Sequence, residues 1–476
     1  MASRSGTPQS FVKNPFPNIL RFVAGDFVAK TINLLAFVYL ARTLGVETYG
    51  VLELAIAILT YFLKTADGGL EMWAMRGAAR GVDMNHLIGR VVPLRGLLAV
   101  LSFGALLALL PVFPKYESLR MLLVIFGFTA IVEGVSLRWV FMGQERLAGV
   151  AIGLVVGQIV FAMGVFALVG GPEGVILVAV LRLAGDFVMV GYFFWLFTQM
   201  HGRKKVVFTL NGGAAIFREA FPLGVTHFLG LASYNFDTVL LGFLKGSVAV
   251  GLYNAAYRPV TVALALPMTY FHGLFPVLSR TFVQSELEFR TAVRHSLWMT
   301  TICALPLGVG ATFLAEPILE VVFGPDYAPG TPALRLLGWS AALTVLRGTF
   351  RQGLLAAGHQ KLDLGCSTFS VALNVFLNFL LIPMYGIQGA AGATLVSEAI
   401  WLALAIHLFR RHVMSLSLLP FLWGPMMGAL VMICCFLLIS SWPWVFQSVA
   451  AALVYLPTVF LMRLTPTPKP LTDYLG

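Results

Sequence analysis

The sequence predicts an all-α polytopic membrane protein with about fourteen transmembrane helices, for three reasons. The chain is 59% hydrophobic and only 11% charged, whereas soluble domains are about 25% charged. Its apolar stretches each approach the roughly 20 residues that cross a hydrocarbon core of about 30 Å. They are far longer than the roughly ten residues of a barrel strand and do not alternate strictly, so they are expected to be helices.

The expected spans follow one another with short loops between them, and each bound is given to about three residues. In chain order they are residues 18–40, 49–72, 88–111, 119–142, 150–170, 174–199, 217–242, 249–278, 293–315, 332–357, 363–383, 389–410, 418–440 and 444–463.

Lysine and arginine gather in alternate loops, which predicts the topology. Fourteen of them lie in loops on one side, and three, Arg42, Lys115 and Lys245, lie on the other. Because basic loops stay in the cytoplasm, both termini are expected inside, in a multi-pass protein of the cell inner membrane. The net charge of +11 is thus a topology signal, and no nucleic-acid partner is expected.

The chain also repeats itself at fixed offsets. The matched pairs are Gly45–Gly246, Gly50–Gly251 and Ala55–Ala256, then Gly143–Gly358 and Gly171–Gly386. Spans 1–6 and 7–12 are therefore expected to form two six-helix lobes in the same orientation, a parallel repeat, with spans 13 and 14 as accessory helices that face lipid or hold an acyl chain. The expected domains are a cytoplasmic N-terminal tail (1–17), an N-lobe (18–199), a cytoplasmic linker (200–216), a C-lobe (217–412), and the accessory spans with the tail (413–476).

Charged side chains inside spans are candidates for function, because each costs about 2.5–3.5 kcal/mol on insertion scales. Arg258 has no opposite charge within a turn of its own helix, so we expect its partner elsewhere and a contact with an anionic substrate. Asn254 shares its face, and Arg347 in span 10 is the next candidate. Other polar residues in the spans have a structural role as the alternative to binding substrate. Asp26 and Lys30, with Asn33 beside them, can neutralise each other; Arg182 and Asp186 can pair within one helix; and Asn374 and Asn378 can form interhelical hydrogen bonds.

Motifs for other chemistry are missing from the sequence. It contains no Walker A sequence, HExxH or GxSxG. The four cysteines, Cys303, Cys366, Cys434 and Cys435, fall inside expected spans without metal-ligand spacing. We therefore expect no metal site, no cofactor and no enzyme activity. Because the start of the chain is polar and proline-rich, we also expect no cleaved signal peptide.

Five segments resemble the polysaccharide-unit flippases of the multidrug/oligosaccharidyl-lipid/polysaccharide exporter superfamily. They are LARTLGVETYG (40–50), FPLGVTHF (221–228), YNFDTVLLGFLKGSVAVGLYNAAYRP (234–259), GLLAAGHQKLDL (353–364) and NFLLIPMYGIQGAAGATLVSE (378–398). Fourteen spans are typical of the lipid II branch, but the start of the chain lacks the pattern of that branch, which favours the polysaccharide branch.

The resemblance implies a V-shaped, alternating-access transporter of two six-helix lobes. It implies that oligosaccharide units on polyprenyl pyrophosphate move from the inner to the outer leaflet, with glycosyltransferases or a polysaccharide polymerase as further partners. Lys30, Lys64, Arg258 and Arg347 are the basic residues that match the family's basic lumen, and Asn33 and Asn254 lie beside them. Asp26 and Asp237 are the candidates for coupling to a cation.

Two other functions remain open at this point. A cation-coupled multidrug exporter of the same superfamily would need a more acidic lumen and would depend on Asp26. A polytopic glycan-modifying enzyme would need catalytic acids in an outer loop, where only Glu316, Glu320 and Asp326 are found in the longest one.

Overall fold

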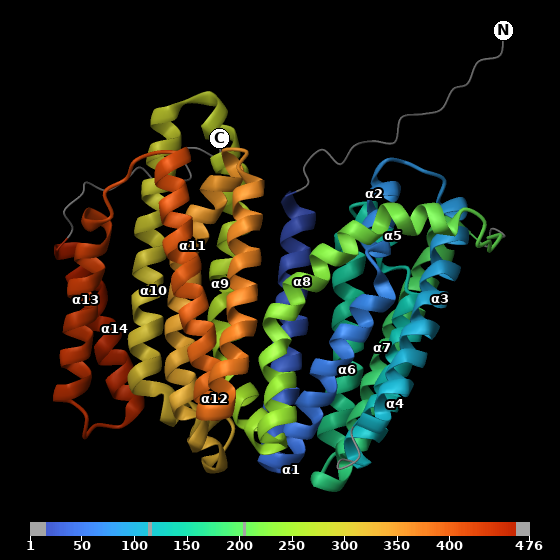
Figure 1. Ribbon diagram of the computed structural model, residues 1–476, viewed down its shortest axis with the longest axis horizontal. Coiled ribbons are helices and arrows are strands. Elements are labelled where there is room, and N and C mark those ends of the chain that lie inside the picture. The colour runs from blue at the N-terminus through green and yellow to red at the C-terminus, as the bar shows by residue number, and fades with distance from the viewer. Residues whose placement is uncertain (1–15, 113–116, 203–205, 463–476) are drawn as a thin grey trace. The chain divides into compact units, whose positions relative to one another are not determined.

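The computed structural model describes residues 16–112, 117–202 and 206–462, with the side chains of 16–20, 226, 227 and 229–234 left aside. Within these ranges the chain folds into helices and contains no strand (Figure 1), which confirms the all-α prediction. Most of the expected N-terminal tail, the linker residues 203–205 and the tail beyond 462 lie outside the described residues.

The first of two compact units comprises Met1–Leu44 and Ala55–Leu231. Its helices are α1 (Phe16–Asp67) apart from residues 45–54, α2 (Leu70–Ala79), α3 (Met84–Leu109), α4 (Glu117–Gly134), α5 (Arg138–Gly143), α6 (Leu147–Leu168), α7 (Val175–His201) and the start of α8 (Gly213–Lys245), with short 3-10 turns at Leu110–Val112 and Pro172–Gly174.

The second unit comprises Gly45–Leu54 and Ala232–Gly476. It contains the end of α8, α9 (Ser247–Gln284), α10 (Glu286–Val322), the 3-10 helix η3 (Pro325–Gly330), α11 (Thr331–Ala356), α12 (Gln360–His412), α13 (Leu419–Leu438) and α14 (Trp444–Leu461). The limits expected for the two lobes, 18–199 and 217–412, stay a prediction.

Two of the longest elements are interrupted at glycines. α1 has 52 residues and α12 has 53, so either would be about 80 Å long if straight, more than twice a hydrocarbon core. The backbone leaves helical geometry at Gly45 (φ 74°, ψ 166°) and at Gly386 (φ 56°, ψ −128°). Each element is thus two helices joined at one glycine, because positive φ is strained for other residues.

Several of the described helices are long and apolar enough to span a membrane. Nine helices within the described residues are long and apolar enough to cross a membrane when elements such as α1 and α12 are each taken whole. The figure of fourteen spans stays a prediction, while the chain is a multi-pass membrane protein.

Small residues allow helices to pack closely in both units. In the first unit, a side chain at Gly157 or Gly185 would meet the other glycine's carbonyl oxygen, at 3.1 and 2.7 Å respectively, so α6 and α7 approach backbone to backbone. Such contacts replace the hydrophobic effect as the basis of helix association in lipid.

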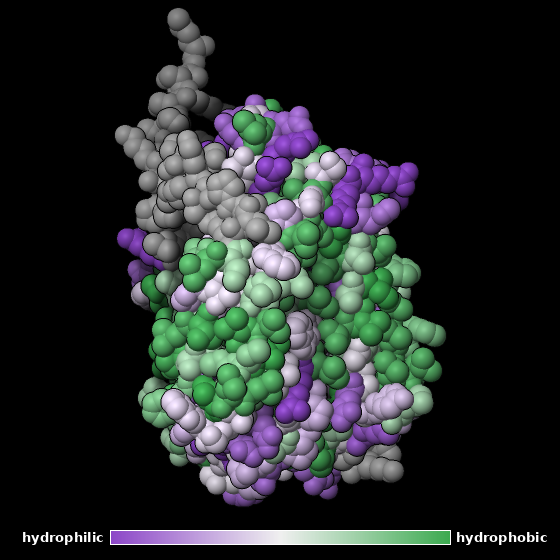
Figure 2. All heavy atoms as spheres, turned by 90° about the vertical axis from the view of Figure 1, so that its left-hand side faces the viewer, coloured by the Kyte–Doolittle hydropathy of each residue, from purple (hydrophilic) through white to green (hydrophobic). Residues whose placement is uncertain are grey.

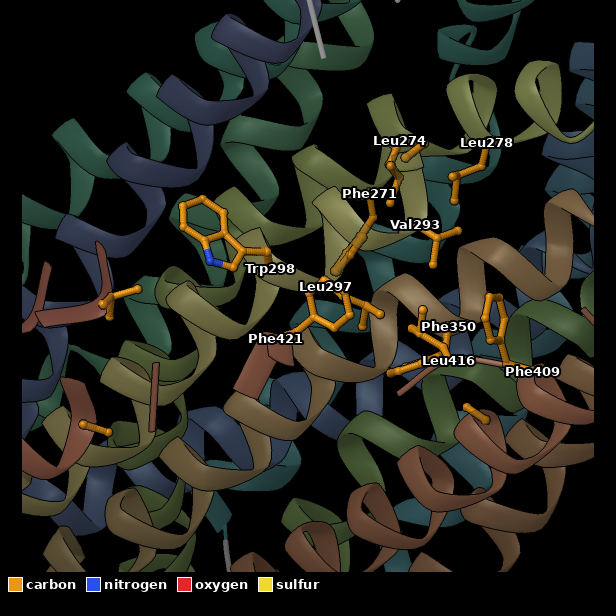
Figure 3. Close-up of a cluster of buried hydrophobic side chains, with 14 of the residues drawn as sticks. Phe271, Leu274, Leu278, Val293, Leu297, Trp298, Phe350, Phe409, Leu416 and Phe421 are labelled. Carbon is orange, nitrogen blue, oxygen red and sulfur yellow. The ribbon is translucent and has the colours of Figure 1, made fainter. Parts of the chain in front are cut away.

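A large cluster of buried hydrophobic side chains forms the core of the second unit (Figure 3). Phe271 of α9 packs against Gly348, and Phe409 of α12 packs against Gly353, so that each ring occupies the space of a missing side chain. Tyr455 of α14 donates a hydrogen bond to the Ile302 carbonyl oxygen at 2.9 Å, which fixes the accessory helices to α10.

The face that bears α13 and α14 is apolar across its middle and hydrophilic toward both ends (Figure 2). Leu430, Leu437, Leu453 and Phe460 are among the large apolar residues exposed on these two helices. This distribution fits a surface that is covered by lipid.

Candidate functional site

A small charged cavity lies inside the first unit. It has a volume of about 80 Å³ and is lined by Lys64, Asp67, Glu71, Arg95, Glu133 and Arg138, with Thr60, Leu63, Ala66, Ala130 and Gly134 between them. Three bases therefore face three acids, so the cavity is close to neutral. A cavity of this size holds several water molecules and is far too small for an oligosaccharide.

Two ion pairs organise the charged cavity. Arg138 donates hydrogen bonds to the Glu71 carboxylate from two nitrogens. Its Nη2 lies 2.8 Å from Oε1 and 3.1 Å from Oε2, and its Nε lies 3.0 Å from Oε1. Arg95 Nε lies 3.5 Å from Asp67 Oδ1, and the Arg95 side chain is only 6% exposed. Only the Arg138–Glu71 pair is bidentate among these two, a geometry that adds strength and directionality to an Arg–carboxylate pair.

Two broken helices meet at the charged cavity. α1 ends at Asp67, whose carboxylate accepts hydrogen bonds from the backbone N–H groups of Gly69 at 3.2 Å and Glu71 at 3.1 Å and so caps the start of α2. α4 ends at Gly134, and the Ser136 carbonyl oxygen in the gap before α5 accepts a hydrogen bond from Arg95 Nη1 at 3.2 Å. The charges therefore satisfy backbone groups that the breaks leave open, as broken helices in membranes require.

Lys64 is the one expected substrate-binding residue that lines this cavity. It is half-buried and shares the cavity with both acids of the α1–α2 break. Lys30 and Asn33 lie elsewhere in the unit: Lys30 Nζ is 2.6 Å from Asp26 Oδ2, and Asn33 donates to Gln158 Oε1 at 3.1 Å. The Asp26–Lys30 pair is the expected i, i+4 pair, and its lysine side chain is 73% exposed.

Arg258 lies in the second unit with 19% of its side chain exposed, and its ion-pair partner lies far away in the sequence. Its Nη2 pairs with the Glu53 carboxylate, and its Nε donates to the Tyr49 hydroxyl at 2.8 Å. The expectation of a partner on another helix is confirmed, while the expected contact with substrate stays a prediction.

The 3-10 helix η3 lies beside the Arg258 pair and contacts Tyr49. Tyr327 of η3 packs edge-on against Tyr49, with ring centroids 6.1 Å apart. Burial, together with the nearby Glu53 carboxylate, raises the pKa of the Tyr327 phenol above its usual value and so disfavours ionisation of this ring further.

Asp237 lies at the centre of a buried hydrogen-bond network. Its carboxylate accepts from the Tyr253 hydroxyl at 2.6 Å, the Thr394 hydroxyl at 3.2 Å and the Asn378 amide at 3.4 Å. Asn378 also donates to Asn374 Oδ1 at 3.0 Å. The predicted hydrogen bonding by these asparagines is confirmed, and it gathers oxygen atoms around one carboxylate.

Asn254 and Arg347 occupy two further places in the second unit. Asn254 donates to the Val250 carbonyl oxygen at 3.0 Å and to the Thr238 hydroxyl at 3.3 Å. Arg347 Nε pairs with Glu398 Oε2 at 3.0 Å, and its guanidinium lies 3.3 Å from the centroid of the Trp401 ring. The expected substrate-binding residues are therefore spread over several environments, and their roles stay predictions.

Sequence reasoning passed over Arg95, Glu53 and Tyr253. Arg95 stands alone in the apolar stretch VVPLRGLLAV, and Glu53 stands alone in VLELAIAIL, so the rarity of charges in spans could have singled out both. Tyr253 carried no comparable signal, because tyrosine is common near membrane interfaces. Within the described ranges, no group of three His, Cys, Asp or Glu side chains could hold a metal ion.

Comparison with protein families gives two matches. The model of a family described as "Polysaccharide biosynthesis protein" matches residues 17–282, and that of a family described as MatE matches residues 222–380.

Two curated relatives extend over most of the chain. The "Probable low-salt glycan biosynthesis flippase Agl15" of Haloferax volcanii is 24% identical over 407 residues, which cover 82% of this chain and 82% of the relative. The "Succinoglycan biosynthesis transport protein ExoT" of Rhizobium meliloti is 23% identical over 420 residues, which cover 83% and 80%.

Two solved structures share the fold. "Lipid II flippase MurJ, inward closed conformation" aligns with a TM-score of 0.75 at 18% identity over 96% of this chain and 100% of that chain. An inward-facing multidrug resistance MATE family transporter aligns with a TM-score of 0.63 at 15% identity over 83% and 97%. The fold is thus that of two-lobed membrane transporters, as the sequence predicted.

Proposed function

Because the chain belongs to the polysaccharide biosynthesis protein family, we propose that it is a flippase for lipid-linked oligosaccharides in the synthesis of cell-surface polysaccharide. The observation that carries the proposal is the family match over residues 17–282, together with relatives named as a glycan flippase and a polysaccharide transport protein. The substrate is an oligosaccharide unit on polyprenyl pyrophosphate, which moves from the inner to the outer leaflet by alternating access.

The proposed cellular setting follows from the loop charges and the named relatives. The protein lies in the cytoplasmic membrane with both termini inside, since basic loops stay in the cytoplasm. It performs no covalent chemistry: glycosyltransferases supply the lipid-linked unit inside, and a polymerase consumes it outside.

Lys30 is our first candidate to bind the pyrophosphate. Its ammonium group is the most exposed of the four basic candidates and pairs with Asp26 only within one helix turn. Such exposed pairs contribute about 0–1 kcal/mol, so an incoming diphosphate can displace Asp26 at little cost. Arg258 and Arg347 are held in buried pairs, and binding substrate would require them to exchange partners at much greater cost.

A deletion strain tests the function. We expect lipid-linked oligosaccharide to accumulate in the inner leaflet and surface polysaccharide to fall, with both restored by the wild-type gene. Lys30→Gln should restore less than Lys30→Arg, whereas Arg290→Gln, which removes an exposed charge at the start of α10, should restore fully. Unchanged surface polysaccharide and an unchanged leaflet distribution on deletion would exclude the proposal.

A cation-coupled multidrug exporter is the second candidate, favoured by the MatE match over residues 222–380 and by the buried Asp237. Loss of drug efflux on deletion, without any change in surface glycan, would support it. In either candidate Asp237 is the coupling residue we favour over Asp26, because three hydrogen bonds hold a desolvated carboxylate in place there.

A further inference from the structure

One short helical segment belongs to a different unit from the rest of its own helix. The chain lies in the first unit up to Leu44, in the second from Gly45 to Leu54, and again in the first from Ala55. Residues 45–54 therefore pack within the second unit although they continue directly into the helix of the first.

This segment packs against the start of α9 through reciprocal glycine contacts. A side chain at Gly50 would collide with the Ser247 carbonyl oxygen, and a side chain at Gly251 would collide with the Val46 carbonyl oxygen. Gly50 and Gly251 are equivalent in the internal repeat, at an offset of 201 residues, and so are Val46 and Ser247. Equivalent pieces of the two repeats thus cross around a local two-fold axis.

The two turns that precede this crossing are also equivalent. Gly45 has φ 74° and Gly246 has φ 85°, both at extended ψ, and each starts the helix that carries the contact glycine. The two repeats therefore contribute the same turn and helix start to the crossing, which we call the glycine clasp: Val46 and Gly50 with Ser247 and Gly251.

The side chains above the glycine clasp break the symmetry. Glu53 pairs with Arg258, but the residue equivalent to Glu53 in the other repeat is Asn254, and the residue equivalent to Arg258 is Ala57. The ion pair therefore exists once. The ion pair, to which Tyr49 adds a hydrogen bond with Arg258, therefore supplements a backbone contact that is itself symmetric.

At the glycines themselves the two helices meet backbone to backbone, so no side chain has to be withdrawn from between them when they part. Carbonyl oxygens face Cα hydrogens there, and each such contact is weak on its own. The Glu53–Arg258 pair fixes the relative orientation of the two helices at this contact. Any movement of the first unit relative to the second must then either pull residues 45–54 off α9 or bend the helix near residue 54.

We propose that the glycine clasp, locked by Glu53 and Arg258, is a releasable joint that must open and reclose during each transport cycle. Release of residues 45–54 from α9 is easier than bending of the helix. Helices kink mainly at glycine and proline, and residues 46–67 contain neither apart from Gly50. The transport prediction rests on the proposed flippase function, whereas opening of the joint can be measured without it.

The first test measures opening directly. With the four native cysteines replaced by alanine, Leu52→Cys is a fully buried reporter on the clasp helix. Adding Gly251→Ala or Arg258→Ala should raise its rate of labelling by a small maleimide about tenfold, because local opening then costs less. Gly392→Ala is the matched control, since a methyl group there meets nothing within 4 Å. Equal labelling rates in all four proteins would overturn the joint.

The second test locks the joint. Glu53→Cys with Arg258→Cys, bridged by a bifunctional reagent that forms a disulfide with each thiol, should stop export of the lipid-linked unit until a reductant cleaves both disulfides. The same bridge between Arg351→Cys and Asp363→Cys, another ion pair of the second unit, should leave export unchanged. Full export by the bridged clasp would overturn the proposal. If wild-type protein itself exports nothing, the flippase function fails, and the labelling rates still decide whether the joint opens.

Discussion

At the scale of single residues, the membrane-spanning part of this protein keeps its charges by pairing them. Arg138 with Glu71, Arg258 with Glu53 and Arg347 with Glu398 each join residues that lie far apart in the sequence. A buried charge that loses its partner is strongly destabilising, whereas loss of the whole pair can be neutral. These pairs therefore determine how the helices are positioned and contribute little net stability.

The Arg138–Glu71 pair gives a direct test of this view. Glu71→Gln should lower the free energy of unfolding by about 3 kcal/mol, the low end of the range for buried pairs, because about a quarter of each side chain is exposed. Glu71→Leu combined with Arg138→Met should recover most of that loss. Thermal unfolding in detergent measures both.

The control for this pair lies on the surface. Glu286→Gln removes an i, i+4 pair with Arg290 whose acid is 77% exposed, so the expected change is below about 0.5 kcal/mol. A change at Glu71 as small as this one would show that the charged cavity does not hold the two helix breaks together.

At the scale of elements, glycine sets where helices reverse and where they touch, and these are separate physical roles. Gly45 has positive φ but no neighbour within 4 Å of an added methyl group, whereas Gly50 has ordinary helical geometry but no room. The first is required by the backbone of its own residue, and the second by the approach of another helix.

The effect of an alanine substitution on the free energy of unfolding should therefore differ in sign between glycine positions. Gly45→Ala should destabilise the fold by about 1–3 kcal/mol through backbone strain alone. Gly392→Ala lies in helical backbone with open space around it and should stabilise by about 0.5–1 kcal/mol through helix propensity. Denaturant or thermal unfolding of the three proteins decides the matter, and equal effects at both sites would contradict the assigned backbone roles.

At the scale of the whole molecule, the loop charges predict which side each turn faces. A reporter that is active only in the cytoplasm should work when fused after Ser285, between α9 and α10, and fail when fused after Gly324, between α10 and α11. The opposite pattern at both sites would reverse the topology and with it the proposed direction of transport.

The sequence predicts the helical class, the repeat and several pairs because each leaves a local signature. The apolar runs reveal the helices, the spacing of Asp26 and Lys30 reveals their pair, and matched glycines reveal the repeat. The partner of Arg258 could not be predicted, because Glu53 lies 205 residues away and only folding brings it near. The charged cavity could be predicted only in part: Lys64, Asp67 and Glu71 lie close together in the sequence, but the helix break between Asp67 and Glu71 and the approach of the other charges depend on tertiary packing.

The central claim, that this chain moves a lipid-linked oligosaccharide across a bilayer, is tested most directly by reconstitution. Purified protein is placed in vesicles that contain a polyprenyl-pyrophosphate oligosaccharide, and a glycosidase that cannot cross the membrane is added outside. Protein-free vesicles should protect about half of the substrate, the inner-leaflet share, because a charged head group crosses lipid very slowly. Vesicles with the protein should expose that protected half over time, and vesicles with the bridged Glu53→Cys, Arg258→Cys protein should not. Protection that persists with the unbridged protein, under every cation gradient applied, would contradict the claim.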